Sequence, residues 1–238
     1  MVDPATGKFL EKKIKPGLSE QSPEAAFDYM KQLLDYAGEK IPPEGHNVTS
    51  LYILGTAGMR LLPDETEEAI YKALREGIRK NYLYDFEDDD IETIDGQEEA
   101  LYRWVALNFA LGNVQDPAGR TTDASAELGG ASMQLAFEMN VEEMEILRRS
   151  ESVGGAPSIE ANVTLGDRTY QMYLASWLGY GANTAFARYY YELEDVPRST
   201  PGNSEVFDSI IAILILRQYD KSMSGLVCNC ISVLKKSY

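Results

Sequence analysis

Two turns in the sequence combine glycine, alanine and hydroxyl side chains in a way that suits phosphate binding. Gly55-Thr56-Ala57-Gly58 follows a short apolar run, and Leu128-Gly129-Gly130-Ala131-Ser132 precedes a segment of alternating polarity. Such turns expose several backbone N–H groups beside a hydroxyl, and together these groups can surround phosphate oxygens. Taken singly, each pattern is more often an ordinary tight turn.

Between the two turns, Gln97-Glu98-Glu99 places carboxylates at the start of an expected helix. A carboxylate beside a phosphate site can orient and deprotonate water. Adjacent helical side chains point about 100° apart, so only one of the two glutamates can face such a site. The alternative is the usual acidic first turn of a helix. No Ser/His/Asp set competes with this chemistry, because the single histidine, His46, lies in a Gly/Pro loop and is expected to be exposed.

Composition narrows the class of protein. The chain has 238 residues, 44% of them hydrophobic, which is enough to bury a core. The 38 acidic and 22 basic residues give a net charge of −16, which argues against nucleic acid as a partner. The apolar run Ile210 to Leu216 is too short to cross a membrane. The cysteines, Cys228 and Cys230, exclude a disulfide scaffold and a four-ligand zinc site.

Hydrophobic periodicity predicts helices in the first half of the chain and antiparallel strands in the second. Helices are expected from Pro23 to Gly38, from Asp64 to Lys80, from Gly96 to Gly112 and from Asn183 to Leu193, and strands at Val48 to Leu54, Met133 to Phe137, Ile159 to Leu165 and Arg168 to Leu174. Gly166-Asp167 is a predicted hairpin turn, and Asp85 to Asp95 is a predicted solvated acidic face.

Five stretches, in order, resemble the nucleoside triphosphate diphosphohydrolases, or apyrases, and most closely their Golgi and lysosomal branch. They are Lys13 to Ser19, Leu51 to Pro63, Gly96 to Glu99 with Trp104 after them, Leu128 to Gln134, and Tyr173 to Gly181. The resemblance covers about residues 11 to 200 and implies an α/β fold of the actin-like ATPase (ribonuclease H-like) type, in which the phosphates of a nucleotide lie between two lobes.

The family motifs also imply roles for individual residues. Glu99 would be the base that activates water, and Ser132 would help to position that water. Ca²⁺ or Mg²⁺, held largely through waters, would offset the phosphate charge, with Glu127 as an acidic residue close to it. Phosphate would be held by Thr56, Ala57, Gly129, Gly130 and Ser132, with Gln134 supporting the same loop.

The sequence departs from the family pattern in three places. The first family signature, a Gly/Ser-rich phosphate hairpin, does not precede Lys13; Glu127 stands where the family has Asp; and the tail after Pro201 does not resemble the rest of the second lobe. We therefore expect an incomplete two-lobed fold, with residues 1–115 as a first lobe lacking its hairpin, 116–200 as the start of the second, and 201–238 as a divergent tail.

The expected function is metal-assisted hydrolysis of nucleoside di- and triphosphates such as UDP, GDP or CTP. Sequons at Asn47 and Asn162 fit a Golgi or related endomembrane lumen, with membrane anchoring only through segments missing from this chain. A catalytically impaired fragment that binds partners is the alternative. Another phosphate chemistry on the same fold, that of a polyphosphatase or a kinase, is less favoured.

Overall fold

The computed structural model describes residues 10–114, 121–149 and 158–193. Their contacts divide these residues into two units, which we call unit 1, up to Ile94, and unit 2, from Asp95 onward. Each unit contains both helices and strands, as the α/β prediction requires. The predicted tail 201–238, with both cysteines and the apolar run Ile210 to Leu216, lies outside the described residues.

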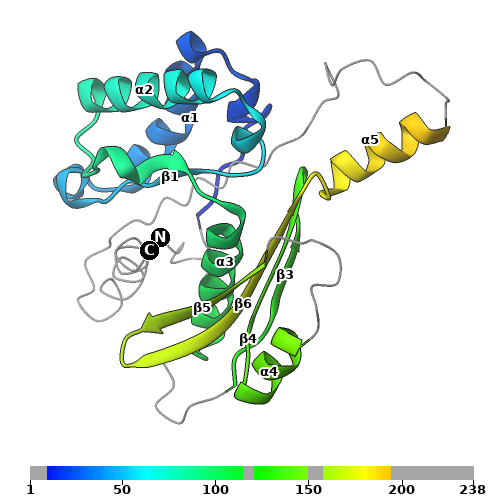
Figure 1. The fold of residues 1–238 in the computed structure, drawn as a ribbon. Helices are drawn as coiled ribbons and strands as arrows, with labels where there is room; N and C mark the ends of the chain where they lie inside the picture. Colours follow the sequence, from blue (N-terminus) through cyan, green and yellow to red (C-terminus); the bar gives the residue numbers. More distant parts are fainter. Residues whose placement is uncertain (1–9, 115–120, 150–157, 194–238) are drawn as a thin grey trace. The chain divides into compact units, whose positions relative to one another are not determined.

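Unit 1 pairs two long helices with a short parallel sheet, and α1 and α2 lie side by side (Figure 1). The two strands pair in parallel, with Ile53 opposite Ile91. In chain order its elements are the 3-10 helix η1 Leu18–Glu20, α1 Pro23–Lys40, the 3-10 helix η2 Pro43–Val48, β1 Ile53–Gly55, the 3-10 helix η3 Met59–Leu61, α2 Asp64–Asn81, the 3-10 helix η4 Asp88–Asp90 and β2 Ile91–Thr93.

Local sequence explains where α1 begins and supports both ends of α2. Ser22 precedes a proline at the first position of α1, where the missing N–H costs nothing. Acidic residues occupy the first turn of α2 and Arg79 and Lys80 its last, as the helix dipole favours. Both predicted helices are confirmed.

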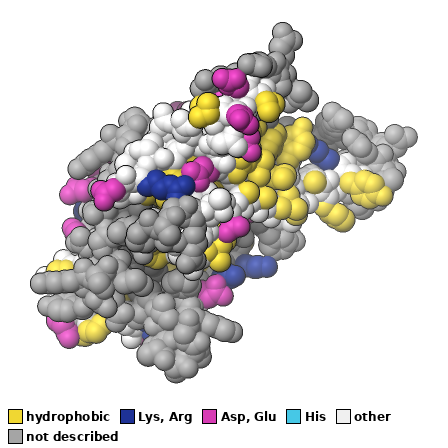
Figure 2. All heavy atoms as spheres, turned by 90° about the horizontal axis from the view of Figure 1, so that it is seen from below, with side chains coloured by type: hydrophobic (Ala, Val, Ile, Leu, Met, Phe, Trp, Pro, Cys, Tyr) yellow, Lys and Arg dark blue, Asp and Glu magenta, His cyan; other side chains and the backbone are white. Residues whose placement is uncertain are grey.

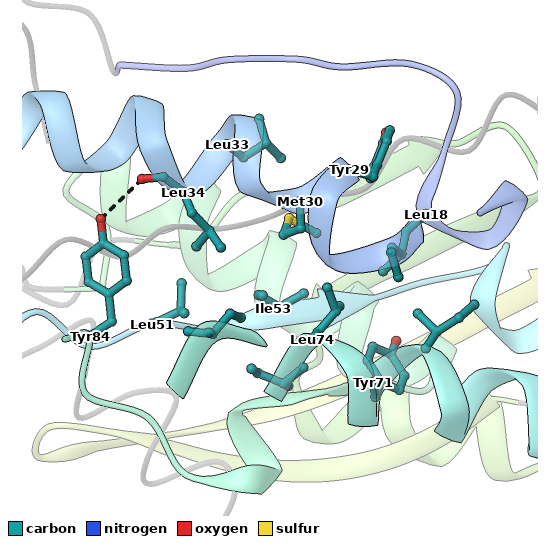
Figure 3. Packing of buried hydrophobic residues seen from close by; sticks show 14 of the residues in the cluster. Leu18, Tyr29, Met30, Leu33, Leu34, Leu51, Ile53, Tyr71, Leu74 and Tyr84 are labelled. Carbon is teal, nitrogen blue, oxygen red and sulfur yellow. Dashed lines mark hydrogen bonds between the residues drawn. The ribbon is translucent and has the colours of Figure 1, made fainter. Parts of the chain in front are cut away.

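The core of unit 1 is apolar and continuous. Figure 3 shows Met30 and Leu34 of α1 facing Ile53 of β1 and Leu74 of α2, all of them buried. Tyr84 adds a hydrogen bond from its hydroxyl to the Leu34 carbonyl, at 3.3 Å. Burial of such side chains is the main source of stability for a unit of this size.

Two sequence predictions in unit 1 are wrong in part. The strand expected from Val48 to Leu54 is limited to Ile53–Gly55, because Val48 belongs to η2 and only Ser50 forms an isolated bridge, to Asp85. The acidic run Asp85 to Asp95 is not uniformly solvated, since Ile91 is buried and Ile91–Thr93 form β2. The three consecutive aspartates Asp88 to Asp90 directly before it hide this short strand in the sequence pattern.

Unit 2 is a four-stranded antiparallel sheet in the order β3-β4-β6-β5, with α3 packed against one face (Figure 1). Gly166, at φ 62°, forms the predicted hairpin turn between β5 and β6. The alternating strands and the helices at both ends are confirmed. Its elements are α3 Gly96–Ala110, β3 Ser125–Leu128, β4 Ser132–Glu138, α4 Val141–Arg149, β5 Ser158–Leu165, β6 Arg168–Leu178 and α5 Ala182–Leu193.

One face of the sheet in unit 2 packs against α3. Ala136, Met172 and Leu174 are buried on the face that packs with α3, around Trp104. On the other face the rings of Phe137 and Tyr173 stack 5.0 Å apart. On the face that Figure 2 draws, hydrophobic side chains, in yellow, form a cluster toward the right of the view. In the described parts of the chain, no helix is both long and apolar enough to span a membrane.

Two polar positions singled out in the sequence are also placed. His46 is half-buried rather than exposed, since its Nε2 lies 3.0 Å from the Ile41 carbonyl oxygen and its ring packs against Tyr84. The exposure predicted for His46 is therefore wrong. The sequon residues Asn47 and Asn162 are exposed, so burial blocks glycosylation at neither.

Candidate active site

The first candidate phosphate turn, in unit 1, is fixed by its backbone carbonyls. Gly55 O accepts a hydrogen bond from Ile94 N at 3.0 Å, and Thr56 O accepts one from Arg60 N at 3.1 Å. A Cβ atom on Gly55 would lie 2.1 Å from the Tyr71 hydroxyl, so only glycine fits there. The turn is thus held by its neighbours, with Ala57 buried against them.

The second turn, in unit 2, is held by hydrogen bonds from the backbone at the start of α5. Gly129 O accepts from Ala182 N at 2.8 Å, and Gly130 O accepts from Asn183 N at 2.9 Å. These bonds satisfy N–H groups that the first turn of a helix would otherwise leave open. A Cβ atom on Gly181 would lie 2.3 Å from Gly130, which shows how closely the two backbones approach. With these carbonyls bonded inward, an anion would have to be held by the N–H side of the turn.

Three buried polar side chains follow this turn on the face that α3 covers. Gln134 donates from Nε2 to the Ser132 hydroxyl at 2.6 Å and to the Ser176 hydroxyl at 3.2 Å. Gln134 and Ser176 are register partners on β4 and β6, so the sheet itself aligns them. Gln134 Oε1 is buried and has no hydrogen-bond partner among the described residues. A buried acceptor of this kind is costly unless something donates to it.

The two adjacent glutamates of α3 have separate tasks. Asp95 caps the helix, and the carboxylate of Glu98 accepts the Asp95 N–H in return, at 2.9 Å. Glu99 takes no part in this capping box and is only 6% exposed. A Cβ atom on Gly96 would lie 2.1 Å from Ser176 Oγ, so glycine lets the start of α3 approach β6. The prediction that the two carboxylates diverge is confirmed.

One cation, Arg103, lies beside two of the predicted site residues. Its Nη2 is 3.8 Å from Glu99 Oε1 on the same helix, and its Nε forms an ion pair with Glu127 Oε2 of β3. Burial lowers the pKa of the Arg103 guanidinium, while the Glu99 carboxylate acts in the opposite direction. Arginine nonetheless stays protonated in proteins, so Arg103 contributes a full positive charge.

Comparison with known proteins identifies the family. The sequence model of the GDA1/CD39 (nucleoside phosphatase) family matches residues 3–210. The chain belongs to the GDA1/CD39 nucleoside phosphatase family. The predicted relationship to apyrases is therefore confirmed, and with it the α/β fold class of the actin-like ATPase type.

Individual relatives agree with this assignment. The chain is 38% identical over 184 residues to nucleoside-triphosphatase ntp-1 of Caenorhabditis elegans, 35% over 206 residues to ectonucleoside triphosphate diphosphohydrolase 4 of Mus musculus, and 31% over 198 residues to the Golgi apyrase of Schizosaccharomyces pombe. These alignments cover 75%, 74% and 81% of this chain and 32%, 33% and 34% of the relatives. The chain thus spans about a third of the length of the curated relatives it matches.

Within unit 2 of this GDA1/CD39 chain, the structure places several predicted site residues on one face of the sheet. Ser132, Gln134 and Glu127 lie on the face of the sheet that packs with α3, the helix that carries Glu99. Thr56 and Ala57 belong to unit 1. The division into units falls before α3, whereas the sequence placed the first lobe at residues 1–115, and those lobe bounds stay a prediction.

The residues predicted to support a metal do not form a cation site as they stand. Across the described segments, no three His, Cys, Asp or Glu side chains come together in a way that could hold a metal ion. The proposed ligand Glu127 faces the guanidinium of Arg103. Divalent cations such as Ca²⁺ and Mg²⁺ bind carboxylate oxygens, and here an arginine already engages them. The described side chains therefore offer no site of direct carboxylate ligands, whereas the resemblance implies a metal held largely through waters.

Sequence reasoning missed Arg103 and Ser176. Arg103 follows Glu99 by four residues, a spacing at which opposite charges meet on a helix, so its contact with Glu99 could have been predicted. The pairing of Arg103 with Glu127 and of Ser176 with Gln134 joins distant parts of the chain. No local signal in the sequence indicates either.

Proposed function

We propose that this chain carries the water-activating part of a nucleoside phosphatase that hydrolyses nucleoside di- and triphosphates. The observation that carries the proposal is the buried, unpartnered Oε1 of Gln134, next to Ser132 and on the face covered by the helix of Glu99. A water that donates one hydrogen bond to this oxygen would relieve the cost of its burial.

In the proposed reaction, Glu99 accepts a proton from that water while its oxygen attacks the terminal phosphorus. The bond from phosphorus to the bridging oxygen breaks, and the products are inorganic phosphate and the nucleotide shortened by one phosphate. Phosphoryl transfer needs positioning and charge stabilisation rather than a covalent nucleophile from the protein. The N–H groups of Thr56, Ala57 and Gly130 would bind the phosphates, with Ser132 helping to hold the water. Gly129 would shape the same turn, because its own N–H donates to the Ser132 carbonyl at 2.9 Å.

We further propose that UDP, GDP or CTP are typical substrates, in the Golgi or a related endomembrane lumen. The support is the similarity to proteins named Golgi apyrase and ectonucleoside triphosphate diphosphohydrolase, together with the two exposed sequon residues, Asn47 and Asn162. Ca²⁺ or Mg²⁺ remains a prediction of the resemblance, and no step above depends on it.

The test compares two glutamates that are neighbours in sequence. Phosphate release from UDP and CTP is measured, with Ca²⁺ or Mg²⁺ added, for the parent protein, Glu99→Gln and Glu98→Gln. We expect kcat to fall by about 10²–10⁴-fold in Glu99→Gln, the usual contribution of a general base. Glu98→Gln should stay near the parent rate, because glutamine also serves in a capping box. Full activity in Glu99→Gln would overturn the role of Glu99.

The same assay distinguishes the proposed hydrolysis from a second candidate function, that of a catalytically impaired form that binds nucleotide or partners. It is favoured by the fact that the chain spans about a third of its relatives. It predicts binding of UDP by the 238-residue chain without phosphate release, and equal, background rates for both glutamine variants. Turnover that depends on Glu99 would exclude it.

A further inference from the structure

The side chain of Ser176 lies where β4, β6 and α3 meet. Ser176 is only 6% exposed, and its hydroxyl accepts a hydrogen bond from Gln134 Nε2 at 3.2 Å across the β4–β6 pair. The first residue of α3 packs against it, since a Cβ atom on Gly96 would lie 2.1 Å from Ser176 Oγ. Ser176 therefore contacts both the helix that carries Glu99 and the amide group beside the proposed water.

Two hydroxyl groups account for both hydrogens of the Gln134 amide nitrogen. Nε2 carries two N–H groups, and its acceptors are the hydroxyl oxygens of Ser132, at 2.6 Å, and of Ser176. With the nitrogen held on this side, the planar amide places Oε1 on the other side, where it has no hydrogen-bond partner among the described residues. The two serines thus decide which end of the amide faces the proposed water.

The direction of the amide matters for the proposed reaction. A water that donates one proton to Gln134 Oε1 and the other to Glu99 keeps its lone pairs for the phosphorus atom. If the amide turned over, Nε2 would instead donate to the oxygen of the water and engage one of those lone pairs. A buried N–H without an acceptor is costly, so loss of the Ser176 hydroxyl favours the reversed amide.

We propose that Ser176 is a positioning residue of this site, whose hydroxyl fixes the amide of Gln134 so that Oε1 faces the attacking water. In this arrangement Ser176 touches neither the water nor the substrate and acts through Gln134 alone. The inference rests on the proposed function, because it concerns the water of that reaction. Its structural part, the direction of the amide, is measured without nucleotide.

The first experiment observes the amide directly. Hydrogen exchange of the two Nε2 protons of Gln134 is followed by NMR in the parent protein and in Ser176→Ala, with no nucleotide present. In the parent we expect both protons to be protected, since each has a buried acceptor. In Ser176→Ala at least one of them should exchange about tenfold faster, because one hydrogen bond is lost. A rapidly exchanging proton in the parent, or unchanged protection in Ser176→Ala, would overturn the inference. The parent spectrum decides by itself if Ser176→Ala does not fold.

The second experiment tests whether Ser176 acts through Gln134. Phosphate release from UDP, with Ca²⁺ or Mg²⁺ added, is measured for the parent protein, Ser176→Ala, Gln134→Ala and the double variant. We expect Ser176→Ala to lower kcat about tenfold with little change in KM. In the Gln134→Ala background the same substitution should have no further effect, because the amide that it positions is absent. Effects that multiply would contradict the proposal and leave Ser176 a structural role only.

Thr49 of unit 1 provides the matched control. Its buried hydroxyl donates to the Gly45 carbonyl at 2.7 Å, and Thr49→Val removes that hydrogen bond while keeping the shape of the side chain. Thr49→Val should destabilise the protein to a similar extent as Ser176→Ala and leave kcat unchanged. An equal loss of kcat in both variants would show that lost stability, rather than lost positioning, slows the reaction.

Failure of this inference is distinguishable from failure of the proposed function. If no variant releases phosphate, the parent included, the proposed reaction fails, and hydrogen exchange of the Gln134 amide still tests the role of Ser176. Glu99-dependent turnover that Ser176→Ala leaves unchanged would refute the inference and leave the proposed function standing.

Discussion

Among its described residues, unit 1 buries Thr49 and the hydroxyl-bearing side chains of Tyr29, Tyr52, Tyr71 and Tyr84 in an otherwise apolar core. Unit 2 also has an apolar core, but its buried polar side chains are those of Glu99, Asn108, Asn113, Ser132, Gln134 and Ser176. Burying polar groups costs stability unless each finds a partner. The comparison teaches that the side chains proposed to do chemistry are buried in unit 2, whereas the proposed phosphate turn of unit 1 lies at an apolar core.

The polar groups of unit 2 are themselves of two kinds. Asn108 makes bonds to the Trp104 carbonyl, to both backbone groups of Asp123 and to Asn113, and so ties the end of α3 to the chain before β3. Gln134, by contrast, leaves its oxygen open. A fully bonded amide stabilises a fold, while an open one beside hydroxyl groups is a place for a ligand or water.

The largest expected effects come from matched leucines, one in each core. Leu74 of α2 and Leu174 of β6 are both 0% exposed, so replacing either by alanine leaves a cavity. Each substitution should lower the free energy of unfolding by about 2–5 kcal/mol. Amide hydrogen exchange, measured on both variants, shows which helices and strands lose protection.

If the units are separate folding regions, Leu74→Ala should speed exchange in α1 and α2, and Leu174→Ala in α3 and the antiparallel sheet. A variant that loosens both units to the same extent would break the comparison, because the two cores would then behave as one.

A smaller effect is expected from crowding the turn of unit 2. In Gly181→Ala the new methyl group would lie 2.3 Å from Gly130, so the backbone of the turn must move. We expect a loss of about 1–3 kcal/mol in unfolding free energy, typical of overpacking, with weaker nucleotide binding. Chemical denaturation and UDP titration measure the two consequences.

The matched control lies in unit 1. Gly38 is inside α1, and a methyl group there would come no closer than 3.6 Å to another heavy atom, the Tyr84 hydroxyl oxygen. Gly38→Ala should therefore stabilise the protein by about 0.5–1 kcal/mol. Equal behaviour of the two alanine variants would show that the turn does not depend on the close approach of Gly181.

Sequence was most informative where a structure depends on neighbours in the chain. The proline and apolar spacing of α1 predicted that helix, and Gly166-Asp167 predicted the hairpin of β5 and β6. The strand β3 is not among the predicted strands, because only two of its four residues, Ala126 and Leu128, are apolar and it pairs as an edge strand. The helix α4, Val141–Arg149, was not predicted either.

The site divides in the same way. Glycine-rich turns and the Glu98-Glu99 pair are local features, so the sequence could propose them. The contacts of Gln134 with Ser176 and of Arg103 with Glu127 depend on the register of β3, β4 and β6. Periodicity does not fix that register, so the ion pair of Arg103 and Glu127 emerged only from the fold.

The smallest expected effect concerns a surface carboxylate of unit 1. Lys31 Nζ and the Tyr82 hydroxyl both donate to Asp35, and these bonds hold the pKa of its carboxyl below the ordinary value. A lowered pKa in the folded state stabilises the protein above about pH 4 and stops doing so as pH falls through the folded value. For an exposed pair the gain in unfolding free energy is only about 0.3–0.5 kcal/mol.

The free energies of urea unfolding of the parent and Asp35→Asn should therefore differ slightly at about pH 6 and converge near about pH 3. A difference as large as that from the leucine variants would mean that unit 1 also depends on its charges, and the contrast with unit 2 would no longer hold.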